Sequence, residues 1–151
     1  MAKIQKDINI VNRKASFEFS FIEKYVAGMQ LTGTEIKSIR EGKASLAEGY
    51  CFLLKGELWT RGIHISEYTE GTVYNHNPTR ERKLLLSKQE LNKLEKKLKD
   101  QGLTIIPLRL FIAESGYAKL EIALAKGKKI HDKRDDIKKK DVQREMDRKI
   151  K

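Results

Sequence analysis

Residues 103–124 constrain the fold of this chain more than any other stretch. Every second residue from Ile106 to Ile112 is apolar, and this period of two places the apolar side chains on one face of a strand. Glu114-Ser-Gly116 supplies a turn, and YAKLEIAL (117–124) continues as a second strand. A strand, a short turn and a second strand predict an antiparallel pair. Pro107 cannot donate a ladder hydrogen bond, so we expect it at an edge or near a strand end.

Further strands are predicted on both sides of this pair. Phe17, Phe19 and Phe21 alternate with polar residues, which indicates a strand over 17–21. Residues 50–55 and 57–65 flank Gly56 and predict a hairpin. Short strands without regular strand–helix alternation favour a small antiparallel barrel over a parallel α/β sheet.

Two helices are predicted. Ser87 and Glu90 form a capping box, apolar residues recur at helical spacing from Leu91 to Leu98, and Gly102 is a candidate stop. A second helix covers 34–40, where Ile36 and Ile39 face inward.

The charge of the chain points to a polyanionic partner. Its 151 residues carry 32 Lys and Arg against 21 Asp and Glu, a formal net charge of +11. Neutralised phosphates release counterions, so nucleic acid is the first candidate; a basic surface that serves only solubility is the alternative. Residues 126–151 hold 12 basic and 6 acidic residues with too few apolar side chains for a core, so we expect this tail to be disordered when free. Val142, Met146 and Ile150 would line one helix face on a partner, and a solvated extension without a partner is the alternative.

Several classes of function are not supported by the sequence. No apolar run approaches the roughly 20 residues of a membrane-spanning helix, and the N-terminus lacks the features of a secretory signal, so we expect a cytoplasmic protein. Gly42-Lys43-Ala44 lacks the first glycine and the Ser or Thr of a phosphate-binding loop. The three histidines and the lone Cys51 show no metal-ligand spacing. We therefore expect a protein that is not an enzyme, with no metal and no cofactor.

Three basic clusters have the composition of phosphate contacts. They are Asn12-Arg13-Lys14, Arg80-Glu81-Arg82-Lys83 and Lys126-Gly127-Lys128-Lys129. Each could instead be a solvated charged loop.

Five spaced motifs together resemble one family, the SsrA-binding protein (small protein B) of bacterial trans-translation. They are Asn12-Arg-Lys-Ala15, Gly33-Thr-Glu-Ile-Lys-Ser-Ile-Arg40 with Gly42-Lys43, Asn75-His-Asn-Pro-Thr-Arg-Glu-Arg-Lys-Leu-Leu-Leu86, Ala125-Lys-Gly-Lys-Lys129 and His131-Asp-Lys-Arg134. The resemblance implies a mainly β fold, a closed antiparallel six-stranded barrel of the oligonucleotide-binding (OB) type with two or three flanking helices. It divides the chain into a flexible N-terminus (1–11), an RNA-binding barrel (12–125) and a basic C-terminal tail (126–151).

The resemblance also implies a function and partners. Members of this family bind the tRNA-like domain of transfer-messenger RNA and deliver it to stalled ribosomes, where the tail enters the vacant mRNA channel beside small-subunit rRNA at the decoding centre. Elongation factor Tu and alanyl-tRNA synthetase would be met indirectly, through the RNA, and no membrane is involved.

Residue roles follow from the same resemblance. Asn12 and Leu85 match positions implicated in RNA binding, although Leu85 could instead be core. The expected phosphate contacts are Arg13, Lys14, Lys37, Arg40, Lys43, Arg80, Arg82 and Lys83. The residues expected at the decoding centre are Lys126, Gly127, Lys128, Lys129, His131, Asp132, Lys133 and Arg134. Val26 departs from the pattern, because some members carry an acidic residue there; Glu23 and Glu35 are nearby acids that could compensate.

Two other classes of function stay open at this point. One is a generic single-stranded RNA module, which would display exposed aromatic side chains for base stacking. The other is an RNA-processing enzyme, which would need a pocket with a general base or a metal.

Overall fold

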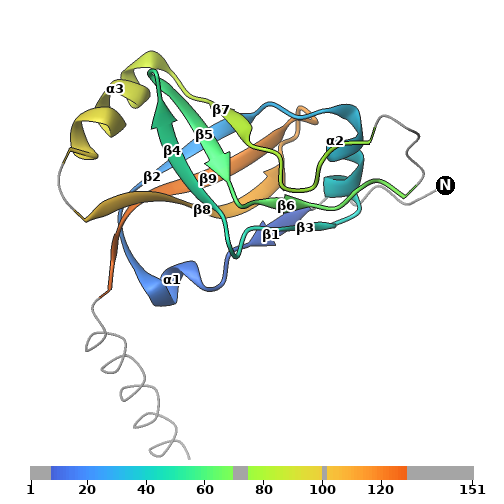
Figure 1. Ribbon diagram of the computed structural model, residues 1–151, viewed down its shortest axis with the longest axis horizontal. Helices are drawn as coiled ribbons and strands as arrows, with labels where there is room; N and C mark the ends of the chain where they lie inside the picture. The colour runs from blue at the N-terminus through green and yellow to red at the C-terminus, as the bar shows by residue number, and fades with distance from the viewer. Residues whose placement is uncertain (1–7, 70–74, 100–101, 129–151) are drawn as a thin grey trace, which may run out of the picture.

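The computed structural model describes residues 8–69, 75–99 and 102–128 and is mainly β (Figure 1). In chain order the elements are β1 (Asn9–Val11), α1 (Ala15–Glu18), β2 (Phe19–Met29), α2 (Gly33–Arg40), β3 (Ala44–Ser45), β4 (Tyr50–Leu54), β5 (Glu57–Arg61), β6 (His64–Ile65), β7 (Arg82–Leu85), α3 (Lys88–Lys97), β8 (Leu103–Ile112) and β9 (Ala118–Gly127).

Six strands form a ring. The strand order is β1-β8-β4-β5-β7-β2-β9, and a further pairing of β9 with β8 closes the ring, which leaves β1 as an additional strand on the edge of β8. Every pairing is antiparallel. The short strands β3 and β6 pair separately. Because side chains alternate along a strand, each strand of the ring has an inner and an outer face.

The predicted antiparallel pair over 103–124 is confirmed as β8 and β9, whose register runs from Leu103↔Lys126 to Ile112↔Ala118. The position expected for Pro107 is wrong. Pro107 lies in the middle of β8, opposite Ile122, where the register shifts between Pro107 and Arg109. A bulge tolerates the missing N–H inside a sheet as well as an edge does.

The strand predicted over 17–21 begins too early. Phe17 belongs to the short helix α1 and is exposed, and β2 then continues to Met29. A bulge between Phe21 and Glu23 changes which residues of β2 face the inside, and for this reason the alternation in the sequence did not reveal the second half of the strand.

The predicted hairpin around Gly56 is confirmed for β4 and β5, whose register runs from Tyr50↔Arg61 to Leu54↔Glu57. Lys55 and Gly56 both have positive φ, 52° and 77°, as two-residue hairpin turns require. Residues 64 and 65, expected in the same strand, instead form β6.

Both predicted helices are present, each with a complete capping box. Thr32 and Glu35 cap α2, and Ser87 and Glu90 cap α3. The helix α3 ends at Lys97 with Leu98 as its C-cap, so Gly102 is not its stop and lies in a turn just before β8.

Two apolar clusters hold these elements together. The larger fills the ring, and α2 and α3, at opposite ends of the strands in Figure 1, contribute Ile39 and Leu94 to it. The smaller lies outside the ring, where Ala15 of α1 covers residues of β8 and β9 such as Ile106 and Ala123. The free Cys51 is buried in the larger cluster, and burial raises the pKa of its thiol.

The domain boundaries expected at residues 11 and 125 need correction. Residues 9–11, assigned to a flexible N-terminus, form β1 on the edge of β8, and Ile8 before them is buried. At the other end, Lys126 and Gly127 continue β9, paired with both β8 and β2. Residues 1–7 and the rest of the expected tail, from Lys129 onward, lie outside the described residues.

Candidate nucleic-acid interface

The second basic cluster runs into β7, where successive side chains point alternately into and out of the ring. Arg82 and Leu84 point into the ring and are buried, whereas Lys83 and Leu85 point outward. Neighbours in the cluster Arg80-Glu81-Arg82-Lys83 therefore have different roles.

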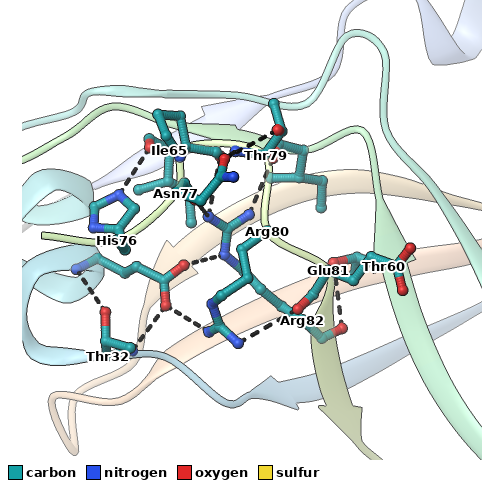
Figure 2. Close-up of polar contacts among 12 residues, drawn as sticks. Thr32, Thr60, Ile65, His76, Asn77, Thr79, Arg80, Glu81 and Arg82 are labelled. Carbon is teal, nitrogen blue, oxygen red and sulfur yellow. Dashed lines mark hydrogen bonds and ion pairs between the residues drawn. The ribbon is translucent and has the colours of Figure 1, made fainter.

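Arg82 is an internal structural residue. Its side chain is 0% exposed and ion-paired with the equally buried Glu35 of α2 (Figure 2). Its remaining N–H groups donate to the carbonyl oxygens of Ile63 and Pro78, at 3.0 and 3.1 Å. A side chain without exposed surface cannot contact a phosphate, so the expectation that Arg82 binds RNA is wrong.

Glu35 also binds Arg80. The distance from Arg80 Nη2 to Glu35 Oε1 is 2.6 Å, and the backbone N–H of Thr32 donates to the same carboxylate at 2.8 Å. Burial alone would raise the pKa of Glu35, but the hydrogen bonds from Arg80, Thr32 and Arg82 hold it below the ordinary value. One carboxylate faces two guanidinium groups, so this cluster keeps a net positive charge, and the side chain of Arg80 is 38% exposed. Arg80 thus stays accessible to an anion.

The outer face of β7 continues across three more strands. Leu85 is 48% exposed, so it is not a core residue. Leu85 pairs with Gly28 of β2, Gly28 pairs with Lys119 of β9, and Lys119 pairs with Phe111 of β8. Because Gly28 has no side chain, Leu85 lies against its backbone, within 3.4 Å of where a Cβ would be.

A second row of outward residues runs beside the first. Val26 of β2 pairs with Glu121 of β9, Glu121 with Arg109 of β8, and Arg109 with Val11 of β1. Val26 is exposed. The nearby acids do not replace an acidic residue at this position, because Glu35 is buried and Glu23 binds Lys97 and Tyr25.

The second row ends beside the first basic cluster. The Asn12 side chain is half-buried and donates to the carbonyl oxygen of Pro107 at 2.9 Å, which fixes the chain between β1 and α1. Arg13 and Lys14 follow it and are exposed. Strand pairings therefore link these residues in a band around the outside of the ring, from β1 and β8 across β9 and β2 to β7, and we call this band the platform. It comprises the outward residues Val11, Arg13, Lys24, Val26, Lys83, Leu85, Arg109, Phe111, Lys119 and Glu121.

Three expected phosphate contacts lie elsewhere, on and just after α2. Lys37 Nζ lies 5.4 Å from the centroid of the Tyr68 ring, Arg40 Nη2 lies 3.5 Å from the carbonyl oxygen of Gly116, and Lys43 pairs with Glu41 at 3.1 Å. These residues form a second basic region, and Arg40 reaches the turn that joins β8 and β9.

The first residues of the basic tail are held by the ring. Lys126 and Gly127 belong to β9, and the backbone N–H of Lys128 donates to the carbonyl oxygen of Glu18 at 2.9 Å. The tail therefore leaves the ring beside α1. The remaining residues expected at the decoding centre, Lys129, His131, Asp132, Lys133 and Arg134, lie outside the described residues.

The described part of the chain contains neither a candidate metal centre nor a membrane-spanning helix. Residues 8–69, 75–99 and 102–128 contain no group of three His, Cys, Asp or Glu side chains that could hold a metal ion. None of the helices within those ranges has the length and apolar character to cross a membrane.

Sequence reasoning missed three strand residues with positive charge that have no basic neighbour in the sequence. Lys24, Arg109 and Lys119 belong to no basic cluster, yet they reach the platform from β2, β8 and β9. Strand phase was the available signal: in KLEIAL (119–124) the apolar residues Leu120, Ile122 and Leu124 face inward, which places Lys119 outward.

Comparison with known proteins agrees with this architecture. The family model described as SmpB protein matches residues 9–151. The SsrA-binding protein of Phocaeicola vulgatus is 60% identical over 144 residues, which is 95% of this chain and 96% of the relative. That of Cytophaga hutchinsonii is 59% identical over 146 residues, or 97% and 95% of the two chains. A chain from a solved structure described as "tmRNA-SmpB: a journey to the center of the bacterial ribosome" superposes with a TM-score of 0.69 at 41% identity, covering 82% of this chain and 86% of that one. The family model covers nearly the whole chain, and the relatives that match over the same length are named SsrA-binding protein. The chain therefore belongs to the SmpB protein family.

Proposed function

We propose that this protein binds the tRNA-like domain of transfer-messenger RNA through the platform and delivers it to stalled ribosomes for trans-translation. The observation that carries the proposal is the band of basic and exposed apolar residues that runs around the outside of the ring from the Asn12 cluster, across β8, β9 and β2, to Lys83 and Leu85 on β7. An outer sheet face with exposed apolar side chains among lysines and arginines suits RNA, because cations contact phosphates while apolar side chains meet unstacked bases.

The six-stranded ring serves in this proposal as a closed barrel of the OB type. Its interior is filled by side chains, so the ligand lies on the outside. Residues 8–128 form the RNA-binding body, and the protein acts as an adaptor rather than as an enzyme.

The basic tail acts in a second step. In this proposal it enters the mRNA channel of a ribosome that lacks message and contacts ribosomal RNA there through its basic side chains. Lys37, Arg40 and Lys43, which are not platform residues, are phosphate contacts available to a second RNA surface.

The experiment compares RNA binding by the full chain and by a version that ends at Lys128, the last described residue. The ligands are the tRNA-like fragment of transfer-messenger RNA, an ordinary tRNA and a single-stranded RNA, each over a salt series. We expect both proteins to prefer the tRNA-like fragment with similar affinity. Equal affinity for all three ligands would instead favour a generic single-stranded RNA module.

The tail is tested by replacing Asp132, Lys133 and Arg134 with alanine. Binding of the tRNA-like fragment should stay within about twofold of the original, while tagging of incomplete proteins in a translation assay should be lost. Unchanged tagging would contradict the two-step mechanism.

A further inference from the structure

We propose that a groove at the β1 end of the platform holds one unpaired nucleotide of the bound RNA, with its phosphate beside Arg13 and Lys24 and its base stacked on Arg109. This inference rests on the proposed function, because it assigns a subsite for the same RNA. The groove lies between the segment that links β1 to α1 and the outer faces of β2, β8 and β9, and has a volume of about 340 Å³.

The lining of the groove combines apolar walls with positive charge. Val11, Phe21 and Leu108 contribute apolar surface, and the cations are Arg13, Lys24 and Arg109. Its size falls within the several hundred Å³ typical of small-ligand sites. A groove with this mixture suits a ligand that has an apolar planar part and a negative charge, as a nucleotide does.

Most of the positive charge in the groove is not neutralised by the protein. Glu121 is the one carboxylate among its lining residues, and it pairs with Arg109 at 3.2 Å. Neither Arg13 nor Lys24 forms an ion pair with any described residue; Lys24 Nζ instead lies 5.8 Å from the centroid of the Phe21 ring. Two cations without counterions beside a half-enclosed groove favour an anion such as a phosphate.

The planar guanidinium group of Arg109 is held in one orientation by its neighbours. Its Nε donates to Glu121 of β9, and its Nη1 donates to the side-chain oxygen of Asn9 of β1 at 3.4 Å. The Phe111 ring covers one side of the guanidinium, with the ring centroid 4.2 Å from Cζ. The groove is lined by Arg109 and not by Phe111, so the other side of the guanidinium meets the groove.

An arginine in this setting can stack on a nucleobase. Guanidinium planes stack on unpaired bases, and the two anchoring hydrogen bonds reduce the conformational freedom that such stacking would cost. Among the described residues, Nη2 of Arg109 has no hydrogen-bond partner, so it stays available to a base edge or a phosphate.

The test uses the full chain and the tRNA-like fragment of transfer-messenger RNA. The first variant, Lys24→Gln with Arg109→Gln, removes two groove charges. Its matched control, Lys88→Gln with Lys96→Gln, removes two exposed charges from α3. The second variant, Arg109→Lys, keeps the charge and the possibility of pairing with Glu121 but loses the plane. Thermal unfolding of each variant verifies that it is folded.

We expect the groove variant to bind about tenfold more weakly than the control and to lower the salt slope by roughly 0.7 for the lost phosphate contact. Arg109→Lys should keep the salt slope, weaken binding about fivefold, and remove protection of one unpaired nucleotide from base-specific chemical modification. A merely structural Arg109 would not produce this loss of protection.

Two results would overturn the inference in distinguishable ways. If the original protein prefers the tRNA-like fragment but the groove variant and its control bind it equally, the groove is not a subsite and the proposed function stands. If the original protein shows no preference for that fragment, the proposed function fails and the inference falls with it.

Discussion

Arg82 and Arg109 lie in two strands of one ring, but Arg82 is buried and structural whereas Arg109 is exposed and available to a ligand. Each pairs with a glutamate of a neighbouring element, Arg82 with Glu35 and Arg109 with Glu121. Inside the ring the Arg82 side chain is 0% exposed and its N–H groups are used by protein oxygens, whereas outside it Arg109 is 38% exposed and keeps a free face. Strand phase, rather than membership of a basic cluster, decides whether an arginine stabilises the fold or is available to a ligand.

The largest effect should come from breaking the inner pair. Replacing Glu35 with Gln leaves the Arg82 guanidinium buried without a counterion and weakens the cap of α2. We expect the free energy of unfolding to fall by about 3 to 5 kcal/mol, as measured by urea denaturation.

A matched control is Glu57→Gln, which removes a carboxylate that pairs with Lys83 on the surface at 3.3 Å. Its effect on stability should stay below about 1 kcal/mol. Equal losses in Glu35→Gln and Glu57→Gln would contradict the distinction between inner and outer pairs.

Lowering the pH should remove the stability that the pair of Glu35 and Arg82 contributes. The pKa of Glu35 is lowered in the folded protein from an unfolded value of 4.5, so its contribution to stability is complete above pH 4.5 and is lost as the pH falls through the folded pKa. We expect the unfolding free energy of the original protein to decline more steeply below pH 4.5 than that of Glu35→Gln. Parallel pH profiles for the two proteins would count against this assignment.

On the outer side, Leu85→Ala should separate binding from stability. An exposed leucine contributes little to the core, so the loss of stability should stay within about 1 kcal/mol. Affinity for the tRNA-like fragment should fall about tenfold, or 1.4 kcal/mol. Leu54→Ala is the control, because Leu54 is similarly exposed but lies at the end of β4 and is not a platform residue. A similar loss of affinity in both variants would refute a specific role for Leu85.

The smallest effect on RNA binding is expected at Lys83, where removing the lysine and removing its carboxylate partner should change the affinity in opposite directions. Lys83→Gln should weaken RNA binding a few-fold and reduce the salt slope by about one contact. Glu57→Gln, which frees Lys83 from its partner, should strengthen binding slightly. Opposite signs are the expected result; weaker binding in both variants would show that the pair matters as a unit.

Much of the fold could be predicted because local signals agreed with tertiary structure. The capping box at Ser87, the turn at Gly56 and the alternation on both sides of Glu114-Ser-Gly116 each specified an element without knowledge of the rest. The errors fall where tertiary contacts override local pattern, as at the bulges after Phe21 and Pro107, and at β1, a short strand held by the edge of β8.

The candidate site was less predictable for a physical reason. Four consecutive charged residues at 80–83 carry no mark that one of them faces the core, since the partner of Arg82 is a helix-capping residue 47 positions away. The alternation of RKLL (82–85) does carry that information once Leu84 is known to be buried. Lys24, Arg109 and Lys119 could not be found by composition, because none of them has a basic neighbour in the sequence.

Strand β9 fixes the distance between the platform and the beginning of the basic tail. One end, at Lys119, lies in the platform, and the other, at Gly127, is where the basic tail begins beside α1. At about 3.3 Å per residue the two points are separated by roughly 26 Å. Since β9 is paired on both sides, this distance cannot stretch. An RNA bound at the platform near Lys119 and a partner bound where the tail begins at Gly127 are therefore held at a fixed distance from each other by β9.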